Sequence, residues 1–461
     1  MSALMKLAIV AVLISLHLFQ ITFAAANATS LEIETKQLTK ILVDSTIVVN
    51  VTIVCKDEKD KCFSSAIQVR LVARSTQPDN IRVVRIERNS TIIFTPEVLR
   101  TSEHTNFSFP ITLTGLFPGF FDLETELLEF GDKNETSRQV FKGNVVRQMR
   151  FIDFAINNIV RVIIFITYTN MGCQLDLGVV KQALLRPIGP VVGFLSQFIV
   201  MPLASYVVGY FLLYEKDVWR LGLFLLGCSP GGNSSNFWTL IFKGDLNLSI
   251  TMTFISCIAC LGMMPLWLYT LGKTISKNVK LEVPFENLVI SLVSLTAPLF
   301  VGVFIKYWKP KWALYSKKII RPLTIIVIIS MLTVAIITQL FIFRMFTVPI
   351  VFIGFLIAFC GYFFGAVFAW LFGLNREQII AVSIETAFQN GGIAFLILRT
   401  SFGYPAVDVA SVPVIAQLLI TGNPLWLVYG AIKLTKRIRQ RKSVNIIDDS
   451  KREMSEISSN V

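Results

Sequence analysis

The stretch GCSPGGNSSNFW, Gly227 to Trp238, lies inside an apolar run from Val218 to Phe242 that is long enough to cross a bilayer as a helix. Pro230 and the two glycines after it fall near the middle of this run, where they are expected to break the helix. Backbone that is broken within hydrocarbon must be satisfied by protein or by a wet cavity. Four side chains with neutral oxygen atoms follow the break: Asn233, Ser234, Ser235 and Asn236. A broken helix with oxygen ligands at mid-membrane is typical of ion and substrate sites in secondary transporters, and the alternative is an ordinary proline kink.

The composition is typical of a multi-pass membrane protein. Hydrophobic residues make up 54% of the 461 residues and charged residues 16%, and the apolar residues are gathered in repeated long runs. The formal net charge of +13 does not indicate nucleic-acid binding, because the basic residues lie largely beside apolar runs, as positive-inside topology predicts. The two histidines, His17 and His104, lie outside the predicted spans, so a histidine-based proton relay or metal centre is not expected. The sequence carries no nucleotide loop, metal-ligand cluster or nucleophile elbow, and therefore no enzyme signature.

The first 150 residues differ in character from the rest of the chain. Residues 1–26 combine Lys6, an apolar core from Leu7 to Phe19 and the small residues Ala24-Ala25-Ala26, which is typical of a cleaved signal peptide. An uncleaved anchor is the alternative. Residues 27–150 contain short segments of alternating polarity, such as STIVVNVTIVC and AIQVRLVAR, with turn residues between them. This pattern predicts an all-β, sandwich-like domain of seven or eight strands.

Glycosylation sequons favour an extracellular location for this β-rich domain. The sequons begin at Asn27, Asn50, Asn89, Asn106 and Asn134. In an oxidising compartment we expect Cys55 and Cys62 to form a disulfide that closes a small loop. The other five of the seven cysteines lie in or beside apolar runs and are expected to be reduced: Cys173, Cys228, Cys257, Cys260 and Cys360. An extracellular partner of this domain is a further prediction, without an indication of its identity.

From Phe151 onward, the hydropathy pattern predicts a transmembrane domain over residues 151–433 with nine helical spans in the lipid bilayer. The spans run over 151–172, 187–213, 218–242, 246–271, 285–306, 318–342, 347–373, 376–401 and 408–432. An extracellular start and nine crossings place the C-terminus in the cytoplasm, and the basic residues of the predicted inner loop at 306–321 agree with this topology. We expect the plasma membrane as the location.

The last 28 residues, 434–461, form a polar tail that is predicted to be cytoplasmic and disordered. Its final residues, Ser459-Asn460-Val461, match a ligand of PDZ domains only weakly.

A second interrupted span, SIETAFQNGGIAFL from Ser383 to Leu396, repeats the pattern of the first. Glu385 lies well inside this span, Gln389 follows one helical turn later, and Asn390-Gly391-Gly392 are expected to break the helix. An ionisable residue at this depth is costly and marks a candidate functional site, while a protonated or lysine-paired structural glutamate is the alternative. Two broken spans, one in each half of the membrane region, predict an inverted repeat with a shared midplane site. One carboxylate among Asn, Ser, Thr and Gln oxygens suits sodium, and Glu385 can serve two neighbouring ions.

Six motifs between Phe151 and Lys433 resemble, in sequence and in order, those of the sodium/bile acid cotransporter family. They are MGCQLDL, QFIVMP, GCSPGGNSSN, KGDLNLSITMT, LGMMPL and ETAFQNGG. The resemblance implies a core domain with two crossed, unwound helices and a panel domain that rocks against it. It also implies two sodium sites, the first with the side chains of Ser235, Asn236, Ser249, Thr253 and Glu385, and the second with those of Gln197, Glu385 and Gln389.

The same resemblance implies uptake of an amphipathic organic anion, such as a bile acid or a steroid sulfate, together with two sodium ions by alternating access. The substrate region is expected at Asn233, Asn390, Gly391 and Gly392. Bile-salt carriers of the family have a bulkier, more polar pair in place of Gly391-Gly392, and the long N-terminal region resembles members with an extended ectodomain, so the substrate identity stays open. The alternatives are a non-transporting receptor or adhesion protein that acts through its ectodomain, and a carrier coupled to another ion, with Glu385 as the proton site.

Overall fold

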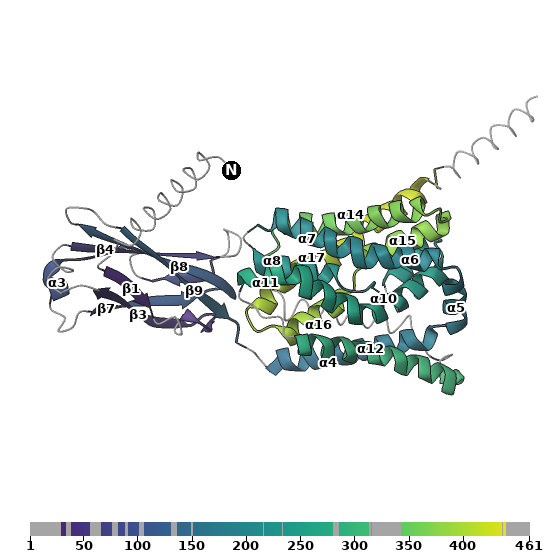
Figure 1. The fold of residues 1–461 in the computed structure, drawn as a ribbon, viewed down its shortest axis with the longest axis horizontal. Coiled ribbons are helices and arrows are strands. Elements are labelled where there is room, and N and C mark those ends of the chain that lie inside the picture. Colours follow the sequence, from purple (N-terminus) through teal and green to yellow (C-terminus); the bar gives the residue numbers. More distant parts are fainter. Residues whose placement is uncertain are drawn as a thin grey trace, which may run out of the picture. The chain divides into compact units, whose positions relative to one another are not determined.

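The computed structural model describes residues 29–33, 38–55, 66–75, 82–87, 91–100, 106–130, 136–148, 151–214, 216–232, 234–279, 285–312, 315, 343–435 and 437–438. The chain divides into two compact units, residues 1–148 (unit 1) and residues 149–461 (unit 2). Figure 1 shows the strands of unit 1 and the helices of unit 2. Several predictions fall outside the described residues: the signal peptide, the span at 318–342, nearly all of the tail, Asn27, Cys62, Asn89, Asn134 and Asn233, and the side chains of Cys55 and Asn106.

Unit 1 consists of two β-sheets. One has four strands in the order β1-β3-β7-β5, and the other has five in the order β2-β9-β8-β4-β6. Neighbouring strands are antiparallel, except that β2 and β9 are parallel. The strands are β1 (Thr29–Ile33), β2 (Ile41–Leu42), β3 (Thr46–Cys55), β4 (Ala66–Ser75), β5 (Val84–Ile86), β6 (Thr91–Phe94), β7 (Asn106–Gly115), β8 (Gly119–Phe130) and β9 (Thr136–Val146), and a short helix, α3 (Pro96–Arg100), follows β6.

The alternating polarity of the strands explains how the two sheets pack. Along β3, Val49, Val51 and Ile53 are buried in a core that also contains Leu71 of β4 and other residues of both sheets, whereas Asn50 points outward between Val49 and Val51. The all-β, two-sheet arrangement agrees with the pattern in the sequence. The described residues form nine strands, more than the predicted seven or eight. Two of these strands, β2 and β5, have two and three residues, which is too short to produce a recognisable alternation.

Unit 2 is α-helical. Its helices are α4 (Phe151–Gln174), α5 (Leu177–Leu185), α6 (Ile188–Leu195), α7 (Met201–Leu212), α8 (Asp217–Gly227), α9 (Ser234–Ile241), α10 (Leu246–Trp267), α11 (Lys273–Val279), α12 (Phe285–Trp308), α14 (Val348–Leu371), α15 (Arg376–Ala387), α16 (Gly391–Ser401) and α17 (Ala406–Thr421). A π-helical segment, Ser196–Val200, connects α6 to α7. The five cysteines of unit 2 are free, and all of them except Cys360 are buried.

Several helices of unit 2 are long and apolar enough to cross a bilayer. Within the described residues there are five such segments, and six if the bent pair of α4 and α5 counts as one span. The five are Ile188–Leu212, Leu246–Ser276, Val289–Trp308, Val348–Leu371 and Ala406–Thr435. The predicted spans at 218–242 and 376–401 are each divided into two helices of 8 to 12 residues, which individually are too short to span a bilayer. Unit 2 is therefore a multi-pass membrane domain, while the nine crossings and the inverted repeat stay predictions.

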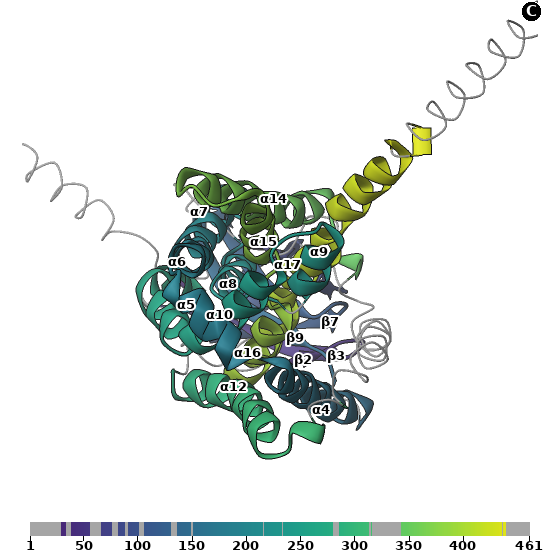
Figure 2. The ribbon, with the colours of Figure 1, turned by 90° about the vertical axis from the view of Figure 1, so that its right-hand side faces the viewer.

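Helices α4 and α12 form a tightly packed pair, and they lie side by side in Figures 1 and 2. A Cβ atom on Gly172 of α4 would lie 2.1 Å from the carbonyl oxygen of Leu299, and one on Gly302 of α12 would lie 2.0 Å from that of Thr169. The two backbones approach this closely only because both positions lack a side chain, as is common where helices pack in membranes. We refer to these two helices below as the α4/α12 pair.

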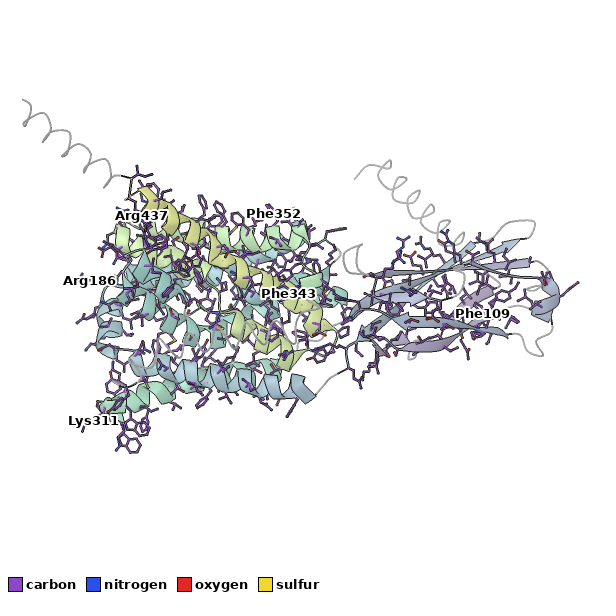
Figure 3. All side chains as sticks on the ribbon, turned by 180° about the vertical axis from the view of Figure 1, so that it is seen from behind. Phe109, Arg186, Lys311, Phe343, Phe352 and Arg437 are labelled. Carbon is purple, nitrogen blue, oxygen red and sulfur yellow. The ribbon has the colours of Figure 1, made fainter. Side chains whose placement is uncertain are left out.

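Three basic residues mark one end of unit 2. Figure 3 shows Arg186, Lys311 and Arg437 at the same end of the helices. Basic residues concentrate on the cytoplasmic side of membrane proteins, so this end is the candidate cytoplasmic end.

We predict that Asn50→Gln removes one N-linked glycan from the protein. Asn50 is exposed in the middle of β3 and begins the sequon Asn50-Val51-Thr52, so its amide is accessible for glycosylation. The measurement is the apparent mass of the protein from glycosylating cells, before and after glycosidase treatment. Thr46→Ala, at an exposed position of the same strand, should leave the mass unchanged. Equal masses for Asn50→Gln and the unaltered chain would show that the site carries no glycan.

Candidate functional site

The two interrupted spans meet at their breaks. One break separates α8 from α9, and the other separates α15 from α16. The amide of Gly232 in the first break donates to the carbonyl oxygen of Phe388 in the second at 2.7 Å, and the amide of Asn390 donates to the carbonyl oxygen of Pro230 at 2.8 Å. Each break thus satisfies backbone groups of the other, which is what non-helical backbone inside a membrane domain requires. We call this arrangement the crossing.

The glycines of the first break allow the crossing to form. Gly231 and Gln389 pair as an isolated antiparallel bridge. A Cβ atom on Gly231 would lie 2.2 Å from Oε1 of Glu385, and one on Gly232 would lie 3.0 Å from the carbonyl oxygen of Gln389. The sequence indicated these glycines as helix breakers. The structure adds that Gly231 also makes room for a carboxylate.

Glu385 lies at the centre of a group of hydroxyl side chains. It is buried, with 2% of its surface exposed. Its Oε2 accepts hydrogen bonds from Ser235 Oγ at 2.5 Å and Ser249 Oγ at 3.1 Å, and its Oε1 accepts one from Thr253 Oγ1 at 2.6 Å. Ser249 Oγ also lies 2.9 Å from Asn236 Oδ1. The structure therefore brings together all five residues that were predicted for the first sodium site.

These five residues come from three elements, and each element contributes for a local reason. Ser235 and Asn236 lie in the first turn of α9, directly after the first break, and Glu385 lies in the last turn of α15, directly before the second. Ser249 and Thr253 are four residues apart on α10 and hence on the same helix face. Within the described residues, no three His, Cys, Asp or Glu side chains lie close enough to hold a metal ion, so a cation at Glu385 would be bound mainly by neutral oxygens.

Gln197 and Gln389, predicted for the second sodium site, are in direct contact. Nε2 of Gln197 donates to Oε1 of Gln389 at 2.7 Å and to the carbonyl oxygen of Ser229 at 2.8 Å. Gln197 lies in the π-helical segment between α6 and α7, a distortion that is frequent at functional sites. Its Oε1 is buried and has no hydrogen-bond partner in the described part of the chain. Because an unpaired buried acceptor is unfavourable, this oxygen is a candidate cation ligand.

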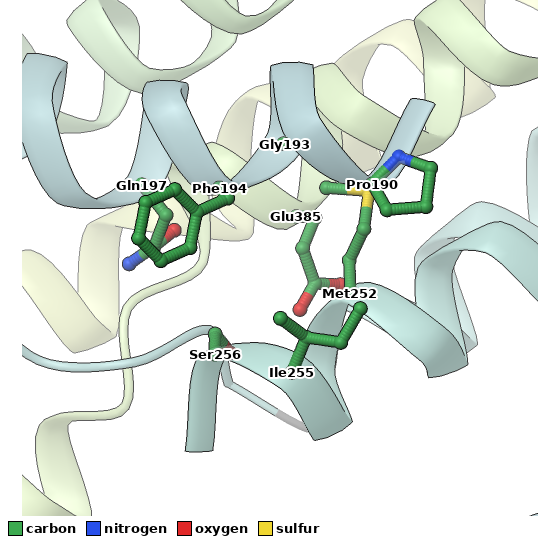
Figure 4. A pocket seen from close by; sticks show the side chains of 8 residues that line it. All are labelled: Pro190, Gly193, Phe194, Gln197, Met252, Ile255, Ser256 and Glu385. Atoms are coloured by element: carbon green, nitrogen blue, oxygen red, sulfur yellow. The ribbon is translucent and has the colours of Figure 1, made fainter. Parts of the chain in front are cut away.

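A small pocket lies between these two groups of residues. Its volume is about 10 Å³, which is close to the space that one water molecule needs and far below that of an organic anion. Figure 4 shows that the side chains of Gln197 and Glu385 both border it. The pocket is therefore an ion-sized space beside residues of both predicted sodium sites. Its lining consists of Pro190, Gly193, Phe194, Gln197, Met252, Ile255, Ser256 and Glu385.

Two serines that the sequence did not single out as ligands also lie at the crossing. Ser256 lines the pocket, and its Oγ accepts a hydrogen bond from the amide of Gly231 at 3.2 Å. Ser229 Oγ lies 3.4 Å from Oε1 of Gln389. A signal for Ser256 was present, because it follows Thr253 by three residues and so shares its face of α10. For Ser229, the sequence offered no spacing of this kind, and only its place beside the first break drew attention to it.

Asn390 connects the second break to α4. Its side-chain Nδ2 donates to the hydroxyl group of Tyr168 on α4. Its Oδ1 accepts from the amide of Ile393 at 3.1 Å and so caps the N-terminus of α16. The Asn390 side chain thus caps α16 and is in contact with the α4/α12 pair.

The two glycines of the predicted substrate region have different surroundings. Gly391 packs against α17, where a Cβ atom would lie 2.3 Å from the side chain of Leu418. At Gly392, Asn390 Oδ1 at 3.4 Å is the one atom within 4 Å of an added Cβ in the structure described. Among the described residues, an added side-chain atom therefore has room beside Gly392 but not beside Gly391.

Comparison with known proteins relates the membrane domain to a family of carriers. Residues 161–347 match the model of the sodium bile acid symporter family. The hepatic sodium/bile acid cotransporter of Rattus norvegicus is 34% identical over 256 residues, which cover 55% of this chain and 70% of that protein. The P3 protein of Homo sapiens is 32% identical over 269 residues, with 58% and 56% covered. The sodium-dependent organic anion transporter of Homo sapiens is 31% identical over 235 residues, with 50% and 61% covered.

We predict that Gly231→Ala destabilises unit 2 by about 1–3 kcal/mol, because the added methyl group collides with the Glu385 carboxylate inside a packed crossing. Gly262→Ala is the matched control, since no atom of the described residues lies within 4 Å of a Cβ at that position of α10 and alanine favours a helix. The measurement is thermal unfolding of the two variants and the unaltered protein in detergent. Equal unfolding temperatures for Gly231→Ala and Gly262→Ala would contradict the packing described here.

Proposed function

Because this chain belongs to the sodium bile acid symporter family, we propose that it carries an amphipathic organic anion across the membrane together with sodium, by alternating access. Members of this family are transporters and not enzymes, and the chain is a multi-pass membrane protein. The observation that carries the proposal is the Glu385 carboxylate, which is buried at the crossing and contacted by the hydroxyl groups of Ser235, Ser249 and Thr253.

The proposal includes two sodium ions that share Glu385. Sodium is a hard cation that prefers several oxygen ligands, and the first site would supply hydroxyl, amide and carboxylate oxygens from Ser235, Asn236, Ser249, Thr253 and Glu385. In the structure the three hydroxyl groups donate to the carboxylate. When an ion binds, their lone pairs turn toward it and the carboxylate neutralises its charge.

The second ion would be held by Gln197, Gln389 and Glu385. The unpaired Oε1 of Gln197 supports this assignment, because a cation would give this buried oxygen the partner that it lacks among the described residues. The pocket between Gln197 and Glu385 has about the volume that one water molecule or one small ion needs. With one carboxylate for two cations, the loaded crossing carries one net positive charge.

The charge that is transported supplies a driving force for uptake. If two sodium ions enter with one monovalent anion, one positive charge moves inward in each cycle. Each unit charge gains about 2.3 kcal/mol per 100 mV of membrane potential, in addition to the energy of the sodium gradient.

For alternating access, we propose that the α4/α12 pair moves relative to the helices that form the crossing. Two polar contacts connect the pair to α16: Tyr168 accepts a hydrogen bond from Asn390, and Ser291 of α12 donates to Thr400 at 2.9 Å. Both contacts would break as the pair moves away from α16. Since Asn390 directly follows the proposed sodium ligand Gln389, ion binding and this movement would be linked through the second break.

We further propose that unit 1 is an extracellular, glycosylated domain and that the protein lies in the plasma membrane with its C-terminus in the cytoplasm. The exposed Asn50 in unit 1 and the basic residues at one end of unit 2 support this orientation. Residues 1–26 would be the signal peptide, 27–150 the ectodomain, 151–433 the transporter domain and 434–461 the cytoplasmic tail. An extracellular partner of unit 1 and a PDZ partner of the tail stay predictions.

We predict that Glu385→Gln lowers sodium-dependent uptake at least tenfold while the protein still reaches the cell surface. The substitution nearly preserves the shape of the side chain but leaves two cations without an anion between them. The measurement is uptake of labelled steroid sulfates and bile salts, with sodium present or replaced by choline, together with surface biotinylation. Glu377→Gln, at an exposed position in the first turn of the same helix, should behave like the unaltered protein. Unchanged sodium dependence in Glu385→Gln would refute the shared-ligand role.

We predict that Asn236→Ala and Gln389→Ala each raise the half-saturating sodium concentration by roughly five- to 150-fold, because each removes one neutral oxygen ligand from a different site. Each variant should also flatten the sodium titration of uptake toward a Hill coefficient of about one, since one of two coupled sites is lost. Uptake that is already hyperbolic in sodium for the unaltered protein, and that neither substitution shifts, would rule out coupling to two ions.

A further inference from the structure

One face of α16 is partly exposed, whereas the rest of this helix is packed. Helix α16 packs against α12, α17 and α8. Its buried residues are Gly391, Ile393, Ala394, Ile397, Leu398 and Ser401. The partly exposed residues recur at intervals of three and four and therefore share the opposite face. These residues, which we call the open face of α16, are Gly392, Phe395, Leu396, Arg399 and Thr400.

Arg399 is the one charged residue of α16, and it lies on this open face. Its guanidinium carbon lies 4.8 Å from the centre of the Phe395 ring. Its Nε is buried and has no hydrogen-bond partner in the part of the chain that the structure describes, and among the same residues it forms no ion pair. Arg399 lies in the last turn of α16, near the end of a predicted membrane span. An arginine at such a position either reaches the membrane surface or serves a ligand. Its guanidinium can bind a carboxylate, sulfate or sulfonate through two parallel hydrogen bonds.

At Gly392, the end of the open face nearest the crossing, the described residues leave room beside the helix. Gly392 lies seven residues before Arg399, which is two helical turns or about 10 Å along α16. A Cβ atom at Gly392 would meet little besides Asn390 Oδ1 among the described residues. Along α16, this face thus presents Gly392, then the aromatic ring of Phe395, then the positive charge of Arg399. This order matches an amphipathic anion, whose apolar body would lie over Gly392 and Phe395 while its charged group reaches Arg399.

The open face also lies next to the helices that we propose to move. Thr400 accepts a hydrogen bond from Ser291 of α12 at 2.9 Å, and Figures 1 and 2 show α16 beside α12. A ligand on this face would therefore contact both α16 and the boundary with the α4/α12 pair. At its other end, α16 begins at Asn390, directly after the proposed sodium ligand Gln389.

We propose that Arg399 determines the specificity of this carrier for anions by binding the carboxylate, sulfate or sulfonate group of the transported molecule. The inference rests on the proposed transport function. It assigns to this chain a charged substrate contact that is separate from the residues of both sodium sites.

The test compares Arg399→Gln and Arg399→Lys with the unaltered protein in uptake of a labelled steroid sulfate. Arg399→Gln should raise the half-saturating concentration of the steroid sulfate by roughly ten- to 150-fold, the effect of removing a charged hydrogen-bond donor. The half-saturating sodium concentration should not change, and Arg399→Lys should recover part of the substrate affinity because it keeps the charge. The matched control is Arg376→Gln, at an exposed arginine at the other end of the same interrupted span, which should change neither value.

Equal half-saturating concentrations of the steroid sulfate for Arg399→Gln and the unaltered protein would overturn the proposal. Proteoliposomes with varied phosphatidylserine content test the other source of an anion, a lipid phosphate. A maximal rate that depends on phosphatidylserine only when Arg399 is present, with unchanged substrate affinity, would assign Arg399 to lipid and also overturn the proposal.

Equilibrium binding of the steroid sulfate to the purified full-length protein separates the proposed role of Arg399 from the proposed transport function. Binding that depends on Arg399 without sodium-driven uptake contradicts the transport function alone, whereas absence of any binding overturns the Arg399 assignment.

Discussion

A carboxylate buried inside a membrane domain must be compensated by its surroundings, and the organisation of unit 2 around Glu385 follows from this constraint. Removing such a group from water costs several kcal/mol. The compensation comes from three hydroxyl groups on two other helices. The carboxylate occupies the position where the Cβ of residue 231 would lie, so a side chain at position 231 would displace it. The break in the first span, the missing side chain at Gly231 and the position of Glu385 therefore depend on one another.

The local features of this site were predictable from the sequence, but their partners were not. Pro230, Gly231 and Gly232 interrupt a helix through their own backbone properties, so the break could be read from the residues alone. The pairing of Gly232 with Phe388 joins distant parts of the chain, and no periodicity carries information about such pairs. Ser235, Asn236, Glu385 and Gln389 were candidates because of their place in the interrupted spans. Their division into two sodium sites, and the addition of Gln197, Ser249 and Thr253, came from the resemblance to a family. The same limit applies to Gly391 and Gly392, which are adjacent in the sequence but differ in what packs against them.

The two units follow the same hydrophobic rule in different solvents. In unit 1 the alternation along β3 separates a buried apolar side from an outward side with Asn50, as expected for a sheet in contact with water. Unit 2 has large apolar side chains on its outside, and Phe211 and Trp308 are 72% and 67% exposed. Polar side chains inside this unit, including Gln197 and Glu385, are instead buried among the helices. This inverted distribution is favourable only in a bilayer, and it leaves the interior polar groups to form specific contacts.

The mutual pairing of the two breaks has a consequence for how the chain is made. The ribosome delivers the first break before the second, since Ser235 and Glu385 are 150 residues apart. At about 5–20 residues per second, roughly 8 to 30 s pass during which the amide of Gly232 and the carbonyl of Pro230 lack their partners in the second break. Each such group costs several kcal/mol in hydrocarbon, so α8 and α9 must wait in contact with water or with the insertion machinery. The folding of unit 2 is thus completed only after α15 and α16 have been synthesised. A chain truncated between the two breaks keeps α8 and α9 without the hydrogen-bond partners that the second break supplies.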